Sequence, residues 1–147
     1  MKSGLLYALG LSLLLASCTA TPSVPSKPGS RTTPVVVKDS ITGTVAYRER
    51  IALSPTAVVR VQLQDVSLQD VAATIVDSVT VRFDGRQVPL PFTLRYDTAR
   101  IRPNNTYTLQ ARITDGGRLL FRTDVAYPVL TRGNPKRVDL QLRRASQ

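Results

Sequence analysis

Apolar and polar residues alternate along most of this chain, and this alternation limits its fold more than any other feature. In Val79–Phe83 and Phe92–Tyr96, for example, every second residue is apolar. Successive side chains of a strand point to opposite faces, so this spacing is typical of strands with one buried face. Seven such runs predict an all-β domain, a single antiparallel β-sandwich of about seven strands. The runs are 41–47, 59–63, 79–83, 92–96, 107–113, 119–127 and 138–142.

Turn-forming residues separate the runs. Asp84-Gly85 and Asp115-Gly116-Gly117 are the strongest hairpin signals, because each stands between well-patterned strands. The segment 67–76 is ambiguous, and it could form a short helical turn or the start of a long bulged strand. All the aromatic residues of the domain fall at inward positions, which predicts core packing, with a carbohydrate-stacking platform as the alternative. They are Tyr47, Phe83, Phe92, Tyr96, Tyr107, Phe121 and Tyr127.

A short apolar run precedes a cysteine near the start of the chain. Lys2 is followed by an apolar stretch that ends at Leu15. The stretch is shorter than the roughly 20 residues of a transmembrane helix, so it predicts a secretory signal peptide over residues 1–17. Leu15-Ala16-Ser17-Cys18 resembles the lipobox of bacterial lipoproteins. The resemblance implies that signal peptidase II recognises Leu15, Ala16 and Ser17 and that Cys18 carries the lipid. An ordinary signal peptide with a chance cysteine is the alternative.

The chain after the signal peptide divides into three parts by composition. Residues 18–40 form the lipidated N-terminus and a tether rich in Thr, Pro and Ser, which holds too little apolar surface to fold. Residues 41–143 are the β-sandwich domain, and residues 144–147 are a C-terminal tail. Thr19 stands where similar lipoproteins carry an inner-membrane retention signal, commonly Asp. The resemblance therefore implies a lipid anchor in the outer membrane of a two-membrane bacterium, with the domain facing the periplasm.

The domain lacks the residues that most enzymes use. The sequence has no histidine and its one cysteine is Cys18, so the commonest general base and the usual zinc ligands are missing. The one glutamate, Glu49, stands between Arg48 and Arg50, which favour its charged form. We therefore expect a non-enzymatic protein that uses no cofactor and no metal. An enzyme acting on envelope glycans is the alternative, if folding brings two distant aspartates together.

Basic residues outnumber acidic residues by 20 to 10, and sixteen of the basic residues are arginines. The planar guanidinium group suits phosphate and carboxylate, so anionic phospholipid, lipopolysaccharide or an acidic protein segment are the expected partners. Nucleic acid is not expected, because export takes the protein away from it. The alternative is an ordinary solvated surface, with arginines scattered over both outer faces. The candidates for binding an anion or a partner are the outward-facing Arg60, Arg82, Arg95, Arg112, Arg122 and Arg143.

Strand and turn positions across the domain resemble the YbaY/YscW family of bacterial lipoproteins. The likeness begins in Ile41–Pro55 and continues through 57–65, and a second stretch runs from Pro91 to Phe121. The resemblance implies a small β-sandwich. Members of the YscW type act as pilotins or chaperones that help a type III secretion secretin to reach the outer membrane and assemble there. This chain looks closer to the YbaY type.

Two functional hypotheses follow. In the first, the domain is an envelope lipoprotein that binds another envelope component, either a protein or an anionic lipid or glycan. In the second, the chain is a pilotin-like factor that assists the localisation or assembly of a secretion channel. The second hypothesis requires a groove or an unpaired sheet edge that can hold a client segment.

Overall fold

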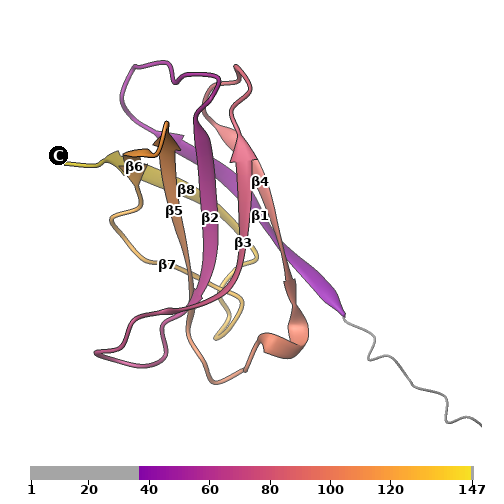
Figure 1. Cartoon of the computed structure of the whole chain (residues 1–147). Coiled ribbons are helices and arrows are strands. Elements are labelled where there is room, and N and C mark those ends of the chain that lie inside the picture. The colour runs from indigo at the N-terminus through magenta and orange to yellow at the C-terminus, as the bar shows by residue number, and fades with distance from the viewer. Residues whose placement is uncertain (1–36, 147) are drawn as a thin grey trace, which may run out of the picture. The chain divides into compact units, whose positions relative to one another are not determined.

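The computed structural model describes residues 37–146, which form eight β-strands and a single turn of 3-10 helix, η1 (Figure 1). The predicted all-β class is confirmed. The signal peptide, Cys18 and most of the tether lie outside the described residues, so the predictions that concern them stay predictions. The elements are β1 (Lys38–Tyr47), β2 (Val58–Asp65), β3 (Thr74–Arg82), β4 (Leu90–Asp97), η1 (Thr98–Arg100), β5 (Tyr107–Asp115), β6 (Arg118–Arg122), β7 (Tyr127–Val129) and β8 (Arg137–Arg144).

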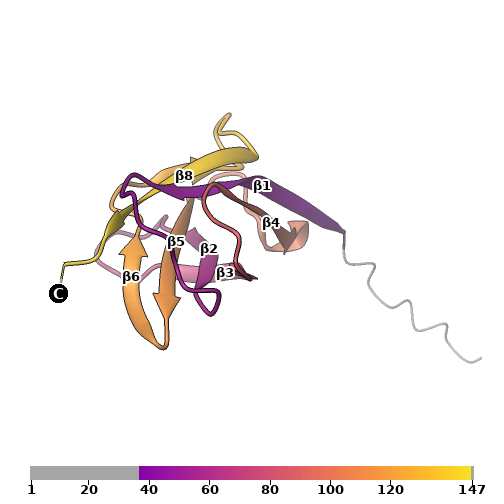
Figure 2. The same ribbon diagram turned by 90° about the horizontal axis from the view of Figure 1, so that it is seen from above.

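The strands form one continuous sheet in the order β3-β2-β5-β6-β8-β1-β4, with β7 paired beside β5. Strand β8 connects two layers, because its first part runs parallel to β1 and its last residues pair with β6. Seen from above, β8, β1 and β4 lie in one layer and β6, β5, β2 and β3 in the other (Figure 2). The sheet therefore wraps round one core like a nearly closed barrel. The predicted sandwich of about seven strands is not confirmed.

The additional strand comes from the predicted run 119–127, which the structure divides. Strand β6 ends at Arg122 and β7 begins at Tyr127. Both strands pair with β5, β6 near its end and β7 near its start. The residues between them leave the sheet so that the chain can pass from one end of β5 to the other.

Inward-facing residues fill the core as the alternation predicts. Every second residue of β4, from Leu90 to Tyr96, is buried. Tyr47 and Phe121 stack with their ring centroids 4.4 Å apart, which brings β1 and β6 together across the core. The other predicted core aromatics are buried as well, except that Tyr127 is half-buried. Their burial favours the core interpretation over a carbohydrate-stacking platform.

One of the two predicted hairpins forms. Gly116 and Gly117 both have positive φ, and they join β5 to β6 in a tight antiparallel hairpin. Asp84 and Gly85 also turn with positive φ, but the strands that they follow and precede, β3 and β4, are not hydrogen-bonded neighbours. The hairpin predicted at Asp84-Gly85 is therefore wrong, because a suitable turn fixes the local bend and not the pairing of the strands beyond it.

Strands β3 and β4 are the two ends of the sheet, and they lie side by side without pairing (Figure 1). We call the gap between them the seam. Asp77 on β3 stands opposite the buried Leu63 of β2, at a position where the alternation would place an apolar residue. Next to it, a bulge at Val76 interrupts the regular pairing of β3 with β2. On the other side, Pro91 places a residue without an N–H in β4. Inward charge, bulges and proline are features that keep strand edges from pairing.

Candidate functional site

A cleft of about 620 Å³ opens at one end of the seam, where β3 begins and β4 ends. We call it the seam cleft. One wall is the loop that follows β2 together with the start of β3, and the other is η1 together with the loop that leads to β5. It is lined by Asp65, Ser67, Leu68, Ala72, Thr74, Val76, Ala99, Arg100, Arg102, Asn105 and Tyr107.

Asp65 ties the two walls of the seam cleft together. Its Oδ1 accepts a hydrogen bond from the backbone N–H of Ser67 at 2.9 Å, and its Oδ2 accepts one from Nδ2 of Asn105 at 2.6 Å. The N–H of Thr106 in turn donates to Oγ of Ser67 at 2.9 Å. Partial burial raises the pKa of Asp65, but hydrogen bonds from Ser67 and Asn105 and the nearby charge of Arg102 outweigh it, so the pKa is lowered overall. The carboxylate therefore stays charged and holds the base of the loop.

Tyr107 fixes the opposite wall. Its ring is buried, and its hydroxyl accepts a hydrogen bond from the N–H of Arg102 at 2.9 Å. The same hydroxyl donates to the carbonyl of Arg100 at 3.4 Å. At the limit of hydrogen-bond distance, Nη2 of Arg100 reaches the carbonyl of Ile75 on β3, 3.5 Å away. Arg100 thus contacts both sides of the seam at the point where the cleft begins.

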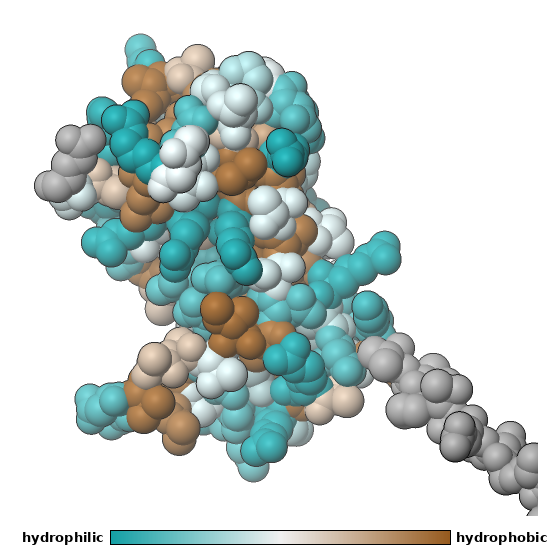
Figure 3. All heavy atoms as spheres, in the orientation of Figure 1, coloured by the Kyte–Doolittle hydropathy of each residue, from teal (hydrophilic) through white to brown (hydrophobic). Residues whose placement is uncertain are grey.

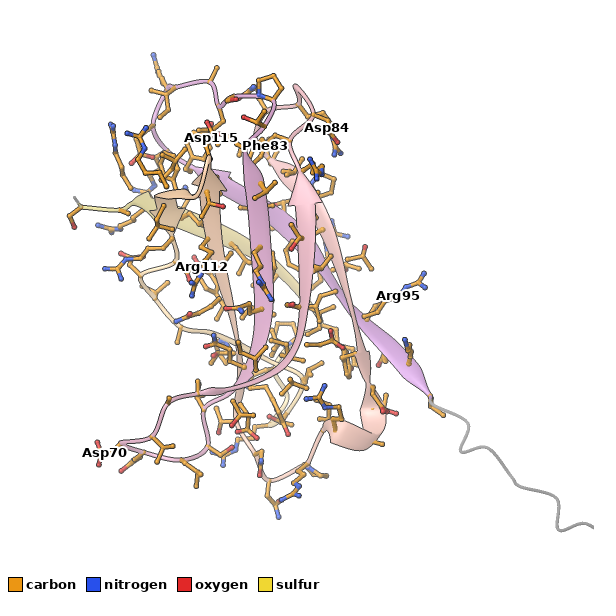
Figure 4. All side chains as sticks on the ribbon, in the orientation of Figure 1. Asp70, Phe83, Asp84, Arg95, Arg112 and Asp115 are labelled. Atoms are coloured by element: carbon orange, nitrogen blue, oxygen red, sulfur yellow. The ribbon has the colours of Figure 1, made fainter. Side chains whose placement is uncertain are left out.

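Two large apolar side chains stand exposed on the loop that forms one wall of the seam cleft. Leu68 and Val71 have exposed fractions of 72% and 63%, and Leu68 lines the cleft. We call them the apolar lip. Both lie on the loop between β2 and β3, whose tip is labelled at Asp70 in Figure 4, and apolar side chains gather on the same loop in Figure 3. Single exposed apolar residues are ordinary, but a group beside a cleft marks a candidate contact surface.

The sequence pattern does not mark the seam cleft. The only signal was the ambiguity of segment 67–76, whose apolar residues matched neither a helix nor a regular strand. The structure explains the ambiguity: the first part is an open loop, and the second is the bulged start of β3, one of the two predicted forms. Arg100 and Arg102 were not among the candidates, because they follow β4 in a stretch without alternation.

Four of the six predicted arginines stand in one cross-strand row. Arg60 on β2 pairs with Arg112 on β5, Arg112 pairs with Arg122 on β6, and Arg122 pairs with Arg143 on β8. Directly paired residues point to the same face of a sheet, and all four side chains are exposed on the outer face. We call this set the arginine row. Figure 4 shows Arg112 on the face toward the viewer and Figure 3 shows hydrophilic side chains across the same region.

The other two predicted arginines lie elsewhere. Arg82 pairs with Val58 at the end of β3, and Arg95 projects from β4 in the second layer, far from Arg112 in the view of Figure 4. All six arginines face outward as predicted. The structure brings four of them together, and whether any of them binds an anion stays a proposal.

Two carboxylates, Glu49 and Asp124, line a separate hollow of about 370 Å³. Oδ2 of Asp124 lies 2.7 Å from Nε of Arg143, so this carboxylate is engaged in an ion pair. Oε2 of Glu49 is buried without a hydrogen-bond partner among the described residues. Between residues 37 and 146, no group of three or more His, Cys, Asp and Glu side chains is placed to hold a metal ion. No helix in that range has the length and apolar character needed to cross a bilayer.

The protein is a small all-β domain with an open cleft at one end of the seam and an apolar lip on the wall of that cleft. Residues 36–142 match the family described as type III secretion system lipoprotein chaperone, YscW. The chain therefore belongs to this family, as its strand and turn positions predicted.

Two relatives place the chain within the family more closely. The uncharacterised lipoprotein YbaY of Escherichia coli K12 is 34% identical over 150 residues, an alignment that covers 97% of this chain and 76% of YbaY. The structure of an alternative pilotin from the type II secretion system of Vibrio cholerae is similar with a TM-score of 0.73 and 46% sequence identity. That similarity covers 76% of this chain and 100% of the pilotin chain.

Proposed function

We propose that this chain is a non-enzymatic, pilotin-like lipoprotein chaperone that holds a segment of a secretin, the channel-forming subunit of the outer membrane, in the seam cleft. The observation that carries the proposal is the apolar lip beside a braced cleft at an open end of the sheet. Membership of the chaperone family and the similarity to a pilotin support the same function. Of the two hypotheses drawn from the sequence, the pilotin-like factor is therefore the better supported.

The lining of the seam cleft indicates what kind of segment would fit. Leu68 lines the cleft and Val71 is exposed on the same loop, so both offer apolar contacts at the mouth. Arg100 and Arg102 are exposed and line the cleft, whereas the acidic Asp65 is occupied by Ser67 and Asn105. The complementary client segment is apolar on the side that meets the lip and carries a carboxylate that reaches the arginines.

The client is placed in the cleft and not along the open edges of β3 and β4. Strand addition needs a free row of backbone N–H and carbonyl groups on a regular edge. Asp77 and the bulge at Val76 interrupt that row on β3, and Pro91 removes a donor from β4. Side-chain contacts with the apolar lip are therefore the better route to affinity.

The anchor completes the proposed function. Acyl chains on Cys18 would hold the chaperone on the outer membrane, because each buried methylene contributes about 0.8 kcal/mol and two or three chains give stable attachment. The described domain starts nineteen residues later, at Val37. A chain of that length can extend by no more than about 70 Å. A client held in the cleft would therefore remain close to the membrane in which it assembles.

Site-specific photo-crosslinking tests the proposal. The full-length protein would be produced together with a secretin in a two-membrane bacterium, with a photo-reactive residue at Leu68 or, as a control, at the exposed Val125 outside the cleft. We expect a crosslink to the secretin from position 68 and none from position 125. A crosslinker at Ala72 in a Leu68→Asp, Val71→Asp background should lose most of its product, and less secretin should assemble in the outer membrane. Equal crosslinking from both positions, or normal assembly in the double variant, would overturn the proposal.

A further inference from the structure

The arginine row places like charges directly opposite one another on three successive strand pairs. Neighbouring strands lie about 4.8 Å apart, so the four residues span roughly 14 Å across the sheet. Like charges at directly opposite positions destabilise a sheet. Arg60, Arg112, Arg122 and Arg143 therefore form an arrangement that works against folding unless something outside the sheet compensates for it.

The chain itself provides little compensation. Nε of Arg143 pairs with Oδ2 of Asp124 at 2.7 Å, and Nη2 of Arg60 donates to the neutral hydroxyl of Ser78 at 3.3 Å. Neither Arg112 nor Arg122 makes an ion pair with any residue between 37 and 146. The two central guanidinium groups of the row therefore lack an acidic counterpart in the part of the chain that the structure describes.

The surface around the centre of the row suits a phosphate group. Arg112 and Arg122 border a small hollow of about 210 Å³, which Gln110 and Thr123 also line. Two guanidinium groups can each present paired N–H donors to phosphate oxygens. The exposed Leu119 lies at the edge of the same hollow and offers an apolar contact beside the charged groups.

We propose that the arginine row is a docking surface for the phosphate-bearing headgroups of anionic membrane lipids. The row lies on the outer face of a sheet, its four side chains are all exposed, and the hollow at its centre holds only about 210 Å³. This shape matches a broad surface with many phosphates better than an acidic peptide, which would require a groove to hold its backbone. The surface is separate from the seam cleft, since none of its residues lines that cleft. The proposal is thus independent of the proposed chaperone function.

Vesicle binding tests the proposal. The full-length protein, with a protease site placed in residues 19–33, would be added to vesicles of phosphatidylcholine alone or of phosphatidylcholine mixed with phosphatidylglycerol. Cleavage of the tether then shows whether the domain stays on the vesicles by itself. Each arginine near an anionic surface contributes about fivefold in affinity, from about 1 kcal/mol converted at 1.4 kcal/mol per tenfold. We expect retention on the anionic vesicles only, and release in about 1 M salt, where charges are screened within about 3 Å.

Two variants with the same change in net charge distinguish binding by the arginine row from attraction by the net positive charge of the domain. Arg60→Gln, Arg112→Gln, Arg122→Gln should weaken retention on the order of 100-fold. The control, Arg82→Gln, Arg95→Gln, Arg137→Gln, removes three exposed arginines outside the row and should weaken it far less. Circular dichroism of both variants checks that the β-structure is retained. Equal loss in the two variants would show attraction by net charge alone and overturn the proposal.

Two further arms identify the source of the anion. Inorganic phosphate in excess should fail to displace the domain from anionic vesicles at matched ionic strength, and displacement would show a site for soluble phosphate. Polyglutamate bound in preference to the vesicles would show a surface for acidic protein segments, and would likewise refute lipid docking. The crosslink from Leu68 to the secretin should be unchanged in the row variant, so failure of this proposal can be distinguished from failure of the proposed function.

Discussion

Replacing Asp65 by Asn should destabilise the domain and loosen the seam cleft. The carboxylate accepts hydrogen bonds from the backbone and the hydroxyl of Ser67 and from the amide of Asn105, so one side chain joins the two walls of the cleft. The amide that replaces it is nearly the same size but carries no charge, and one of its two polar atoms is a donor. Asn105 must then turn over its own amide to restore a contact.

The size of the effect follows from these three hydrogen bonds. Hydrogen bonds to a charged group contribute about 1.5–3 kcal/mol each and neutral ones about 0.5–1.5 kcal/mol, so the change weakens each of them by about 1 kcal/mol. The half-buried amide is easier to desolvate than the carboxylate, which returns about 1 kcal/mol. The free energy of unfolding should therefore fall by about 2 kcal/mol at neutral pH.

Denaturant unfolding measured across a range of pH gives a second signature. Because hydrogen bonds from Ser67 and Asn105 outweigh burial and lower the pKa of Asp65 in the folded state, its contribution is fully present above the unfolded pKa of about 4. It is lost as the pH falls through the lower folded pKa. The difference between the wild type and Asp65→Asn should therefore shrink in acid.

Asp84→Asn is the matched control, because it makes the same chemical change at the other end of the domain (Figure 4). Asp84 is exposed in a turn with φ of 49°, a conformation that Asn adopts equally well, so its stability should change by less than about 0.5 kcal/mol. If Asp65→Asn is no less stable than this control, or if its deficit is the same in acid as at neutral pH, Asp65 does not brace the cleft in the way described.

Three further predictions concern the frame of the domain. A Cβ at Gly43 would lie 1.8 Å from the carbonyl oxygen of Val138, so Gly43→Ala must force β1 from β8 and should cost about 3 kcal/mol or more in denaturant unfolding. Phe83 is fully buried, and Phe83→Ala should cost about 3–5 kcal/mol in the same assay. Lys136→Ala removes an exposed ion pair and should change stability by less than about 1 kcal/mol. Since a hydrogen bond from Lys136 is the main cause that lowers the pKa of Asp39, NMR titration of that variant should show this pKa rising toward its ordinary value.

Alternation along the sequence predicted where most strands lie, but not which strands pair with each other. Period 2 states which side chains of a strand face inward, and residues such as Ile41, Leu94 and Leu140 are buried as it requires. Pairing depends on contacts between distant segments, which no local pattern records. The parallel pairing of β1 with β8 and the missing pairing of β3 with β4 could not be foreseen for this reason. The division of the run 119–127 into two strands could not be predicted, because no glycine or proline marks the place where its residues leave the sheet.

The candidate surfaces were only partly predictable on the same physical grounds. Outward parity correctly placed Arg60, Arg112 and Arg122 on the surface, but their meeting in one row depends on the register of three strands. A shift of one residue in any pairing would send its side chains to opposite faces. The seam cleft depends on two ends of the sheet that stay apart, and so on pairing that does not occur. Its one sequence signal was a segment of apolar residues that fitted no periodic structure.

Features that disfavour strand pairing and exposed apolar side chains lie close together at the seam. Asp77 and Pro91 keep the edges of β3 and β4 from pairing with other chains, at the cost of a charged group facing the core side and a missing backbone donor. If avoidance of contact were the only requirement, the loop beside them would be polar as well. Instead Leu68 and Val71 are among the most exposed large apolar residues that the structure describes. A chain that blocks general edge pairing while it keeps an apolar lip open favours selective contact with one client, which is what the proposed chaperone function requires.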